Sequence, residues 1–382
     1  MPSLATGAET MPRSGIRQVM DLAWSLPGPV IGLHVGEPSF PSPAHVVEAA
    51  RAAYAAGETH YVPNAGIDPL RQAIAEKVST VNGFPATPAQ VVVSAGGAQA
   101  LHNALSLTIG AGDEVLIPDP GWPNYAMAVQ LLQAVPVRYP LRPENGFRPD
   151  PGELAGLVTD RTRLIVVNTP SNPLGTVLPA ADVEALVRFA EDHDLWLLSD
   201  ECYDELTFDR PHVSPGRFDR DGRVLSAFSF SKTYAMTGLR VGYLVSPGED
   251  VARQAAKLQE PLLACVNAPA QAAALAALRG PQDDVVAMRE TYRQRRDLAV
   301  DALGACGLGY LRPEGAFYLW VDVRDRSGGD VGAWSLELLR RDSVAVAPGT
   351  TFGPLGEGWV RLSLATDTDD LLEGIRRMGA AR

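Results

Sequence analysis

Short apolar runs and amphipathic stretches alternate along most of this chain. The apolar runs are bounded by glycine, proline and polar residues, as buried strands are, and they lie at residues 91–93, 114–117, 164–167, 195–198 and 224–228. In the stretch 180–194, the residues Val183, Leu186, Val187 and Ala190 recur at helical spacing. Strand, helix and strand at this spacing form βαβ units, so the pattern predicts a mostly parallel sheet flanked by helices.

The two ends of the chain have a different pattern. A loose tail is expected at residues 1–12, followed by an amphipathic helix at 14–23 and a strand at 30–35. Late in the chain, strands at 317–323, 344–347 and 359–365 are separated by helices at 331–341 and 371–378. Further helices are predicted at 44–56, 70–81, 250–258, 268–278 and 284–303. We therefore expect a large domain over residues 41–285 and a smaller α+β domain built from residues 1–40 and 286–382.

Chemically distinctive residues follow the predicted strands. Ser94, Trp122, Asn172, Asp200 and Lys232 each lie near the carboxyl end of one of them. Because ligands of parallel sheets bind beyond the carboxyl ends of the strands, these residues are expected to line one crevice. Each has an ordinary alternative when taken alone, such as a core aromatic for Trp122.

Two segments favour an anion in that crevice. A strand, the glycine pair Gly96-Gly97 and a helix follow one another, which places free N–H groups and the helix dipole at a turn, although a plain tight turn would look the same. In the second segment, Lys232 lies close to Ser229 and eight residues before Arg240. A lysine in this setting can react at its amine, and the neighbouring arginine can hold a phosphate.

Composition and charge exclude several classes of protein. The 382 residues carry a formal net charge of -12, which argues against an extended nucleic-acid surface. The cysteines Cys202, Cys265 and Cys306 are far apart, so we expect a reduced, cytoplasmic protein with buried thiols. The six histidines have no metal-ligand spacing, and neither a signal sequence nor a membrane-spanning apolar run is recognisable. We therefore predict no metal site, no membrane partner and no nucleic-acid partner.

One kind of ligand accounts for the predicted crevice: a planar, phosphorylated aromatic aldehyde bound as an imine to Lys232. Asp200 would keep the ring nitrogen protonated, and Trp122, Asn172 and Tyr203 would contact the ring and its phenolate oxygen. The phosphate would be held by residues that share hydrogen-bond donors or positive charge, namely Gly97, Ala98, Gln99, Ser229 and Arg240. The cofactor so described is pyridoxal 5'-phosphate (PLP).

At this point the chain resembles a known family, the class I/II aminotransferases of PLP fold type I. The resemblance extends roughly from Ser14 to Arg376, and it rests on motifs that occur in the family's order. They are GEPSFPSP at Gly36, YVPNAGIDPLR at Tyr61, VVVSAGGAQAL at Val91, PDPGWPNY at Pro118, NTPSNPLG at Asn168, SDECYDEL at Ser199, SFSKTYAMTGLRVGY at Ser229, PEGAFY at Pro313 and VAVAPGTTFG…WVRLSLA at Val344.

The resemblance implies a role for each matching residue. Lys232 is the Schiff-base lysine and the acid/base, Asp200 pairs with the pyridinium, and Tyr203 and Asn172 pair with the phenolate oxygen. Trp122 stacks on the ring, and Tyr61 reaches the phosphate of a neighbouring subunit, which implies a homodimer with shared active sites. The substrate α-carboxylate is gripped by Arg361, for which a surface arginine on a strand is the alternative. Gly36, Ile16, Trp122 and Asn172 complete the expected substrate site.

The implied function is the transfer of an amino group from an α-amino acid to a 2-oxo acid by ping-pong kinetics, with 2-oxoglutarate and glutamate as one pair. β-Eliminating lyases and cyclopropane-forming synthases share this cofactor and fold, and no residue in the sequence excludes them. A nicotinamide-binding Rossmann enzyme is excluded because no GxGxxG occurs. A DNA-binding regulator with an aminotransferase-like domain is disfavoured, because few residues precede Ser14.

The substrate side chain is predicted from two departures. Aspartate-preferring relatives supply a cation, in one subgroup a lysine directly after the paired glycines, where this chain has Ala98. In another subgroup the cation is an arginine shortly before the segment that matches residues 267–271. In its place this chain has the residues from Leu262 to Val266. These differences and Ile16 favour a neutral or aromatic side chain over aspartate.

Overall fold

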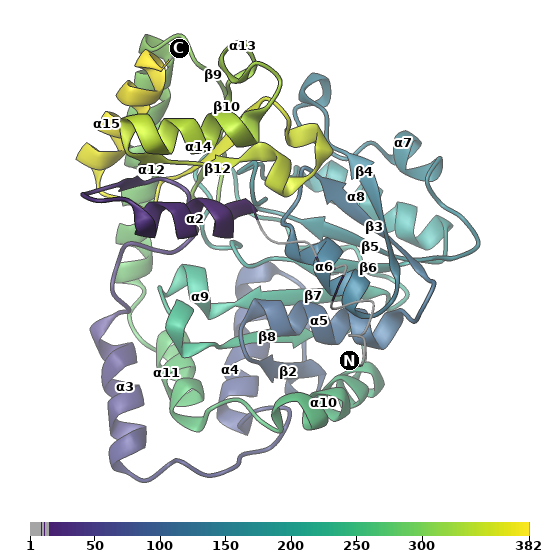
Figure 1. Cartoon of the computed structure of the whole chain (residues 1–382). Coiled ribbons are helices and arrows are strands. Elements are labelled where there is room, and N and C mark those ends of the chain that lie inside the picture. Colours follow the sequence, from purple (N-terminus) through teal and green to yellow (C-terminus); the bar gives the residue numbers. More distant parts are fainter. Residues whose placement is uncertain (1–8, 10, 12–14, 382) are drawn as a thin grey trace, which may run out of the picture.

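The computed structural model describes residues 9, 11 and 15–381. Apart from residues 9 and 11, the tail predicted at 1–12 lies outside this part of the chain, as does Ser14. The elements form a large central sheet with helices on both faces and a second group of strands and helices beside it (Figure 1).

The central sheet has seven strands in the order β2-β8-β7-β6-β5-β3-β4. Their bounds are β2 (Val91–Ser94), β8 (Gly242–Val245), β7 (Val224–Ser229), β6 (Trp196–Asp200), β5 (Thr162–Asn168), β3 (Glu114–Asp119) and β4 (Val135–Pro140). The strands from β7 to β4 are parallel, and β8 runs antiparallel to both of its neighbours, β2 and β7. The predicted mostly parallel sheet is confirmed, and the strands that carry the motifs share one carboxyl edge.

Alternating side chains of the strands pack against a different set of helices on each face of the sheet. One face is covered by α5 (Gly97–Thr108), α6 (Asn124–Leu131) and α10 (Glu249–Leu263). The other face is covered by α3 (Ala44–Ala55), α4 (Asp68–Lys77), α8 (Ala180–Asp192) and α11 (Ala268–Arg279), with α7 (Pro151–Ala155) near the edge (Figure 1). Val92 faces the first set and Val91 and Val93 face the second, as the period of two requires.

The second group contains a four-stranded antiparallel sheet of β12 (Ala347–Pro348), β13 (Trp359–Ser363), β10 (Tyr318–Asp322) and β9 (Gly309–Leu311). Beside it β1 (Ile31–Gly32) pairs in parallel with β11 (Val344–Ala345). The helices are α12 (Asp283–Ala305), α13 (Arg324–Ser327), α14 (Val331–Asp342), α15 (Thr368–Ala380) and α2 (Gly15–Ser25). In Figure 1, α2 lies directly below α14, on the side that faces the central sheet. The domain boundaries remain a prediction.

Three local expectations are wrong in detail. The strand predicted at 30–35 is paired only over Ile31–Gly32, because the chain then leaves β11 to cross toward the central sheet. The strand at 344–347 is split into β11 and β12, which belong to different sheets. The helix predicted to end at residue 258 continues to Leu263; Pro261 removes one backbone hydrogen bond from its last turn, and the helix ends two residues later.

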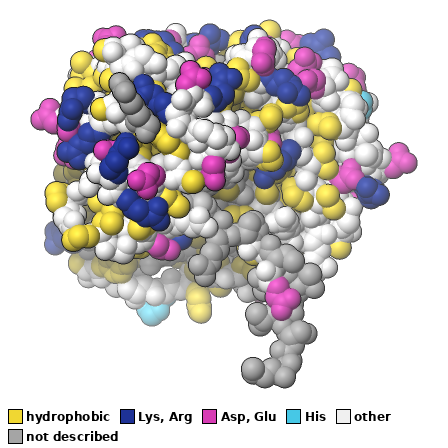
Figure 2. All heavy atoms as spheres, turned by 45° about the horizontal axis from the view of Figure 1, so that its top comes forward, with side chains coloured by type: hydrophobic (Ala, Val, Ile, Leu, Met, Phe, Trp, Pro, Cys, Tyr) yellow, Lys and Arg dark blue, Asp and Glu magenta, His cyan; other side chains and the backbone are white. Residues whose placement is uncertain are grey.

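The surface, the helices and the cysteines add three observations. On the face in Figure 2, basic and acidic side chains are interspersed among hydrophobic and neutral ones. In the described part of the chain, no helix has the length and apolar character needed to cross a bilayer. Cys202, Cys265 and Cys306 are free thiols, but each is only half-buried, which corrects the expectation of buried thiols.

Candidate active site

A cavity of about 400 Å³ lies at the carboxyl edge of the central sheet, where α2 and the second group of strands meet it. Its wall brings together residues from sequence segments that are far apart. The predicted site residues found there are Ile16, Gly36, Gly97, Ala98, Trp122, Asn172, Asp200, Tyr203, Ser229, Lys232, Arg240 and Arg361. The crevice expected from the strand ends therefore exists as one cavity.

Three predicted participants lie outside this wall. Ser94 is completely buried at the end of β2, and its hydroxyl donates to the carbonyl of Gly96. The side chain of Gln99 turns back to accept a hydrogen bond from the N–H of Ala95. Tyr61 is 88% exposed and lines a separate hollow with Tyr54 and the segment that runs from Cys265 to Pro269. Within a single chain, Tyr61 therefore does not contribute to the Lys232 cavity.

Lys232 extends into the cavity from α9 (Phe230–Thr233), a short helix directly after β7. Ser229 caps this helix, because its Oγ accepts a hydrogen bond from the N–H of Ser231 at 3.2 Å. The Nζ atom of Lys232 donates to the carbonyl oxygen of Gly36 at 2.7 Å. The pKa of Lys232 is lowered from 10.5 to about 8, mainly by burial and in smaller part by the nearby cations Arg361 and Arg240. A larger share of this amine is therefore neutral and nucleophilic near neutral pH.

Asp200 is a carboxylate held at the end of β6 and 4% exposed. Its oxygens accept hydrogen bonds from the hydroxyl of Tyr125 at 2.5 Å and from the N–H of Cys202 at 3.2 Å. Burial raises the pKa of Asp200, and these donors oppose the change. No cation pairs with Asp200 among the described residues. A ligand carrying a protonated ring nitrogen would therefore meet an acceptor already in place.

The start of α5 and Arg240 form a cradle that suits an anion. Gly96 has φ of 81°, and a Cβ atom there would lie 2.4 Å from Nη2 of Arg240. At Gly97 a Cβ atom would lie 2.5 Å from Sγ of Cys202, so both glycines are needed for the close approach. The guanidinium of Arg240 is oriented by the carbonyl of Thr237 at 2.8 Å, beside the N-terminus of α5. Cation, helix dipole and glycine backbone together match a phosphate group.

Arg361 is a buried cation at the opposite wall of the cavity, only 2% exposed. From β13, it donates to Oδ1 of Asn172 at 3.1 Å and to the carbonyl of His34 at 2.5 Å. Its Nε atom is buried without a hydrogen-bond partner in the described structure, and no carboxylate there pairs with it. Because a buried unpaired charge is costly, a carboxylate ligand would complete this site.

Sequence reasoning missed several residues of the wall. They are Met20, Val35, Glu37, Tyr125, Cys202, Ser231, Thr237 and Tyr318. Tyr125 and Tyr318 each end a motif that the sequence analysis had singled out, PDPGWPNY and PEGAFY. Their place at the end of a recognised motif is the signal that could have identified them.

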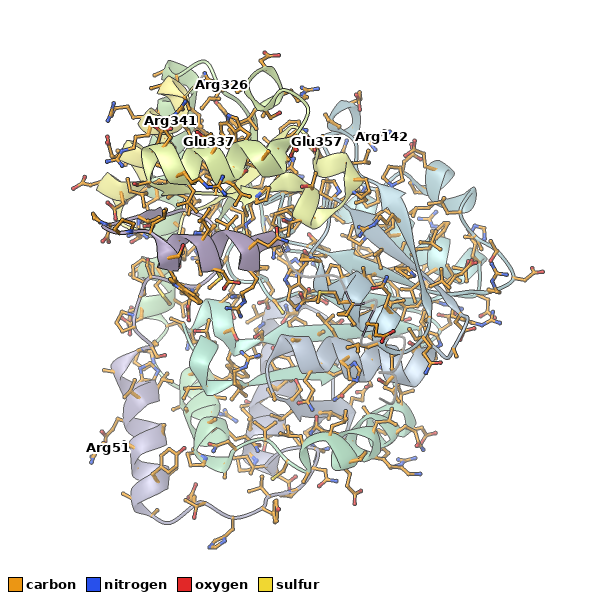
Figure 3. The ribbon with its side chains drawn as sticks, in the orientation of Figure 1. Arg51, Arg142, Arg326, Glu337, Arg341 and Glu357 are labelled. Atoms are coloured by element: carbon orange, nitrogen blue, oxygen red, sulfur yellow. The ribbon has the colours of Figure 1, made fainter. Side chains whose placement is uncertain are left out.

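The donor set of the cavity fits PLP. An amine, a buried carboxylate, an anion cradle and the flat face of Trp122 surround one space. Charged side chains elsewhere, such as Arg51 on α3 and Arg142 after β4, extend from the outer surface (Figure 3). Among the described residues, no group of His, Cys, Asp and Glu is arranged to hold a metal ion.

Comparison with known proteins agrees with the geometry. The family model for aminotransferase class I and II matches residues 28–378. The chain is 41% identical over 351 residues to the aspartate/prephenate aminotransferase of Thermus thermophilus, a match that covers 91% of this chain and 90% of that protein. It is 38% identical over 384 residues to aromatic-amino-acid aminotransferase 2 of Thermococcus litoralis, covering 98% and 97%. A solved single mutant of the Thermus thermophilus aspartate aminotransferase has a TM-score of 0.95 at 39% identity, with all of both chains covered.

The likeness to that solved structure confirms the expected fold, PLP-dependent transferase fold type I. Members of the matched family depend on PLP. Because the family model and the relatives extend over nearly the whole chain, the protein belongs to the class I and II aminotransferases and is an amino acid aminotransferase.

Proposed function

We propose that the protein is a PLP-dependent aminotransferase that moves the amino group of a neutral or aromatic α-amino acid to a 2-oxo acid, with 2-oxoglutarate and glutamate as one pair. One observation carries this proposal: the amine of Lys232 and the carboxylate-free guanidinium of Arg361 face the same cavity. A reactive amine and a carboxylate site in one space are what an α-amino acid requires.

The residues that would hold the cofactor divide by chemical group. Gly97, Ala98, Ser229 and Arg240 would bind the phosphate, and the backbone at Gln99 adjoins them. Asp200 would pair with the ring nitrogen, Asn172 and Tyr203 with the phenolate oxygen, and Trp122 with the ring face. When bound, PLP supplies an electron sink that makes the substrate Cα proton acidic.

The chain's own residues account for the rest of the reaction. Arg361 binds the α-carboxylate and, with the backbone at Gly36, fixes the orientation of Cα. Nζ of Lys232 accepts the Cα proton, which requires the neutral amine that burial favours. Ile16 and Met20 of α2, together with Val35, form an apolar wall that excludes water. The second 2-oxo acid would use the same carboxylate site, so the kinetics are expected to be ping-pong.

The preference for a neutral or aromatic side chain rests on the wall facing the substrate. Ile16, Met20, Val35 and Trp122 are apolar, and Ala98 stands where one aspartate-preferring subgroup has a lysine. The relatives include both an aspartate/prephenate aminotransferase and an aromatic-amino-acid aminotransferase, so either class of substrate fits the family. A rate on aspartate well above the rates on leucine, phenylalanine and alanine would refute the preference.

A β-lyase or related elimination enzyme is the alternative reaction. Incubation with single amino acids, followed by absorbance of the bound cofactor, separates the two. Conversion of the cofactor to its amino form, reversed by 2-oxoglutarate, supports transamination. Ammonia and pyruvate released from cysteine-type substrates without that conversion would support the lyase.

Variants of Lys232 and Arg240 test the site itself. Lys232→Ala is expected to abolish turnover and the absorbance of lysine-bound cofactor, because no other described lysine lines the cavity. Arg240→Ala is expected mainly to raise the dissociation constant of PLP, because the amine and the carboxylate site remain. Equal loss of turnover in both variants at saturating PLP would contradict this division of roles.

We further propose the large domain at 41–285, the small domain at 1–40 and 286–382, a cytoplasmic location and a homodimer with shared sites. The separate sheets support the domain division, and the three free thiols support a reducing compartment. Tyr61, which is exposed and lies outside the Lys232 cavity of its own chain, supports the shared site.

A further inference from the structure

Tyr318 is a buried side chain of the cavity wall to which the proposed reaction assigns no role. It is the first residue of β10 and is 1% exposed. In the antiparallel pair β10–β13, Tyr318 lies opposite Ser363, and Arg361 is the diagonal neighbour two residues away. Side chains two apart share a face of the sheet, so Tyr318 and Arg361 project into the same cavity.

The ring of Tyr318 lies against the guanidinium of Arg361. The distance from Cζ of Arg361 to the ring centroid is 4.3 Å, and the ring of Phe352 is 5.0 Å away. In a desolvated site such a contact stabilises the cation and restricts the plane of the guanidinium. Arg361 has no carboxylate partner in the described structure, so this aromatic face is a principal support of its charge.

The hydroxyl of Tyr318 contacts a different residue, Tyr203. It lies 2.9 Å from the hydroxyl of Tyr203. Burial raises the pKa of both phenols, so both stay protonated and one must donate to the other. If Tyr203 donates to the phenolate oxygen of PLP, its own oxygen is left to accept, and Tyr318 is then the donor. Each hydroxyl in such a chain strengthens the next bond.

The backbone near Lys232 is built around this hydroxyl. A Cβ atom at Gly36 would lie 2.3 Å from the Tyr318 hydroxyl oxygen, so only glycine leaves room for it. The carbonyl of the same glycine accepts the hydrogen bond from Nζ of Lys232. Tyr318 thus contacts Gly36, whose carbonyl binds Lys232, and it also contacts Tyr203 and Arg361.

We propose that Tyr318 is a positioning residue with two separable functions: its hydroxyl supports Tyr203 against the cofactor's phenolate oxygen, and its ring orients Arg361 toward the substrate carboxylate. This inference rests on the proposed function, because it takes Tyr203 and Arg361 in the roles assigned above. Through its contacts with Tyr203 and Arg361, Tyr318 would link the cofactor site to the carboxylate site.

The test compares Tyr318→Phe, Tyr318→Met and Tyr203→Phe as PLP-loaded enzymes. Tyr310→Phe is the matched control, because Tyr310 lies on β9 of the same sheet outside the cavity wall. Two quantities are measured without turnover. One is the pKa at which the visible absorbance of the bound cofactor titrates, and the other is the dissociation constant of 3-phenylpropanoate, a carboxylate without an amine.

The two functions predict different results. Tyr318→Phe should raise the titration pKa by about 0.5 unit, since the phenolate loses support, and leave carboxylate affinity unchanged. Tyr318→Met should also weaken carboxylate binding about 3- to 30-fold, because the ring face is lost. Tyr203→Phe should raise the pKa further, and adding Tyr318→Phe to it should change nothing more, because the hydroxyl acts through Tyr203.

Three outcomes would overturn the inference: an unchanged titration in Tyr318→Phe, an additive pKa shift in the double variant, or equal carboxylate affinity in the Phe and Met variants. Should the Met variant not fold, the Phe variant and the double variant still decide the hydroxyl's role. Failure of the proposed function is recognised separately, because amino acids would then not convert the bound cofactor of the unmodified protein to its amino form.

Discussion

Lys232 and Arg361 are cations kept in a poorly solvated cavity, and each makes the folded chain less stable than a neutral side chain would. The pKa of Lys232 falls from 10.5 to about 8 on folding. Between these values the unfolded chain binds more protons than the folded chain does. The free energy of unfolding of the apoprotein therefore rises with pH across this window.

Replacing Lys232 should consequently stabilise the protein while abolishing its activity. For apoprotein at pH 7 we expect Lys232→Met to increase the free energy of unfolding by about 1–3 kcal/mol. The difference should shrink as the pH rises toward 10.5, because the folded-state amine is then neutral and the unfolded-state amine is increasingly so. Denaturant unfolding at pH 7 and pH 10 measures it, with the exposed Lys257→Met as control. A stability gain that is independent of pH would contradict a charge-based explanation.

Arg361→Lys tests whether geometry as well as charge binds the substrate. Lysine keeps the positive charge but loses the planar fork and the contact with the ring of Tyr318. We expect kcat/KM for the amino acid to fall about 10²- to 10³-fold, with PLP affinity unchanged. Steady-state kinetics and PLP titration measure the two effects, and Arg142→Lys on the outer surface is the control. A decrease in kcat/KM smaller than about threefold would indicate that Arg361 is structural and does not bind the substrate.

A π-helical turn, Val78–Asn82, extends α4 and supports the loop that carries the cofactor-side residues. Residues five apart face the same side of such a turn, and Nζ of Lys77 accordingly donates to Oδ1 of Asn82 at 2.9 Å. Both side chains also bond the buried carboxylate of Asp204, which belongs to the loop after Asp200. Burial lowers the pKa of Lys77, but Asp204, Tyr243 and Glu205 together outweigh this and leave the pKa raised.

This arrangement predicts a large effect from a residue that does not touch the cavity. Lys77→Met leaves Asp204 buried without its ion pair, and we expect the free energy of unfolding to fall by about 3–5 kcal/mol. The double variant Lys77→Met/Asp204→Leu should lose less than the single one, because the charge of Asp204 is removed together with that of Lys77, and only the more distant Glu205 loses its partner. Denaturant unfolding decides, and a double variant at least as unstable as Lys77→Met would show that packing rather than charge accounts for the loss.

Across the whole molecule, the sequence predicted best those parts of the fold and site that depend on a local pattern of residues. The alternation of apolar runs and amphipathic helices was sufficient to predict the mostly parallel sheet, because buried strands and the helices that cover them differ in the spacing of their apolar residues. The strand ends located the cavity, because parallel strands bring their carboxyl ends to one edge. The pairing of β1 with β11 joins residues that are far apart in the chain, and no local pattern encodes it. For the same reason Tyr318 was missed: its neighbours Gly36, Tyr203 and Arg361 come from separate segments.

Tyr61 is a predicted site residue that lines a separate hollow and not the Lys232 cavity of its own chain, and this makes the subunit arrangement testable. If Tyr61 serves the phosphate of a neighbouring subunit, a dimer of Lys232→Ala and Tyr61→Phe chains contains one complete site. In that site the Tyr61→Phe chain contributes Lys232, and its partner contributes an intact Tyr61. If Tyr61 acts within its own chain, the site with Lys232 lacks the tyrosine in every mixed dimer.

We therefore expect Tyr61→Phe homodimers to bind PLP about tenfold more weakly than wild type, which corresponds to losing one hydrogen bond to a charged group. Mixed dimers, separated by differently tagged chains, should bind PLP at their Lys232 site with wild-type affinity. Titration of the lysine-dependent absorbance measures both. Mixed dimers that bind as weakly as the Tyr61→Phe homodimer, or a chain that is monomeric by light scattering with full activity, would disprove the shared site.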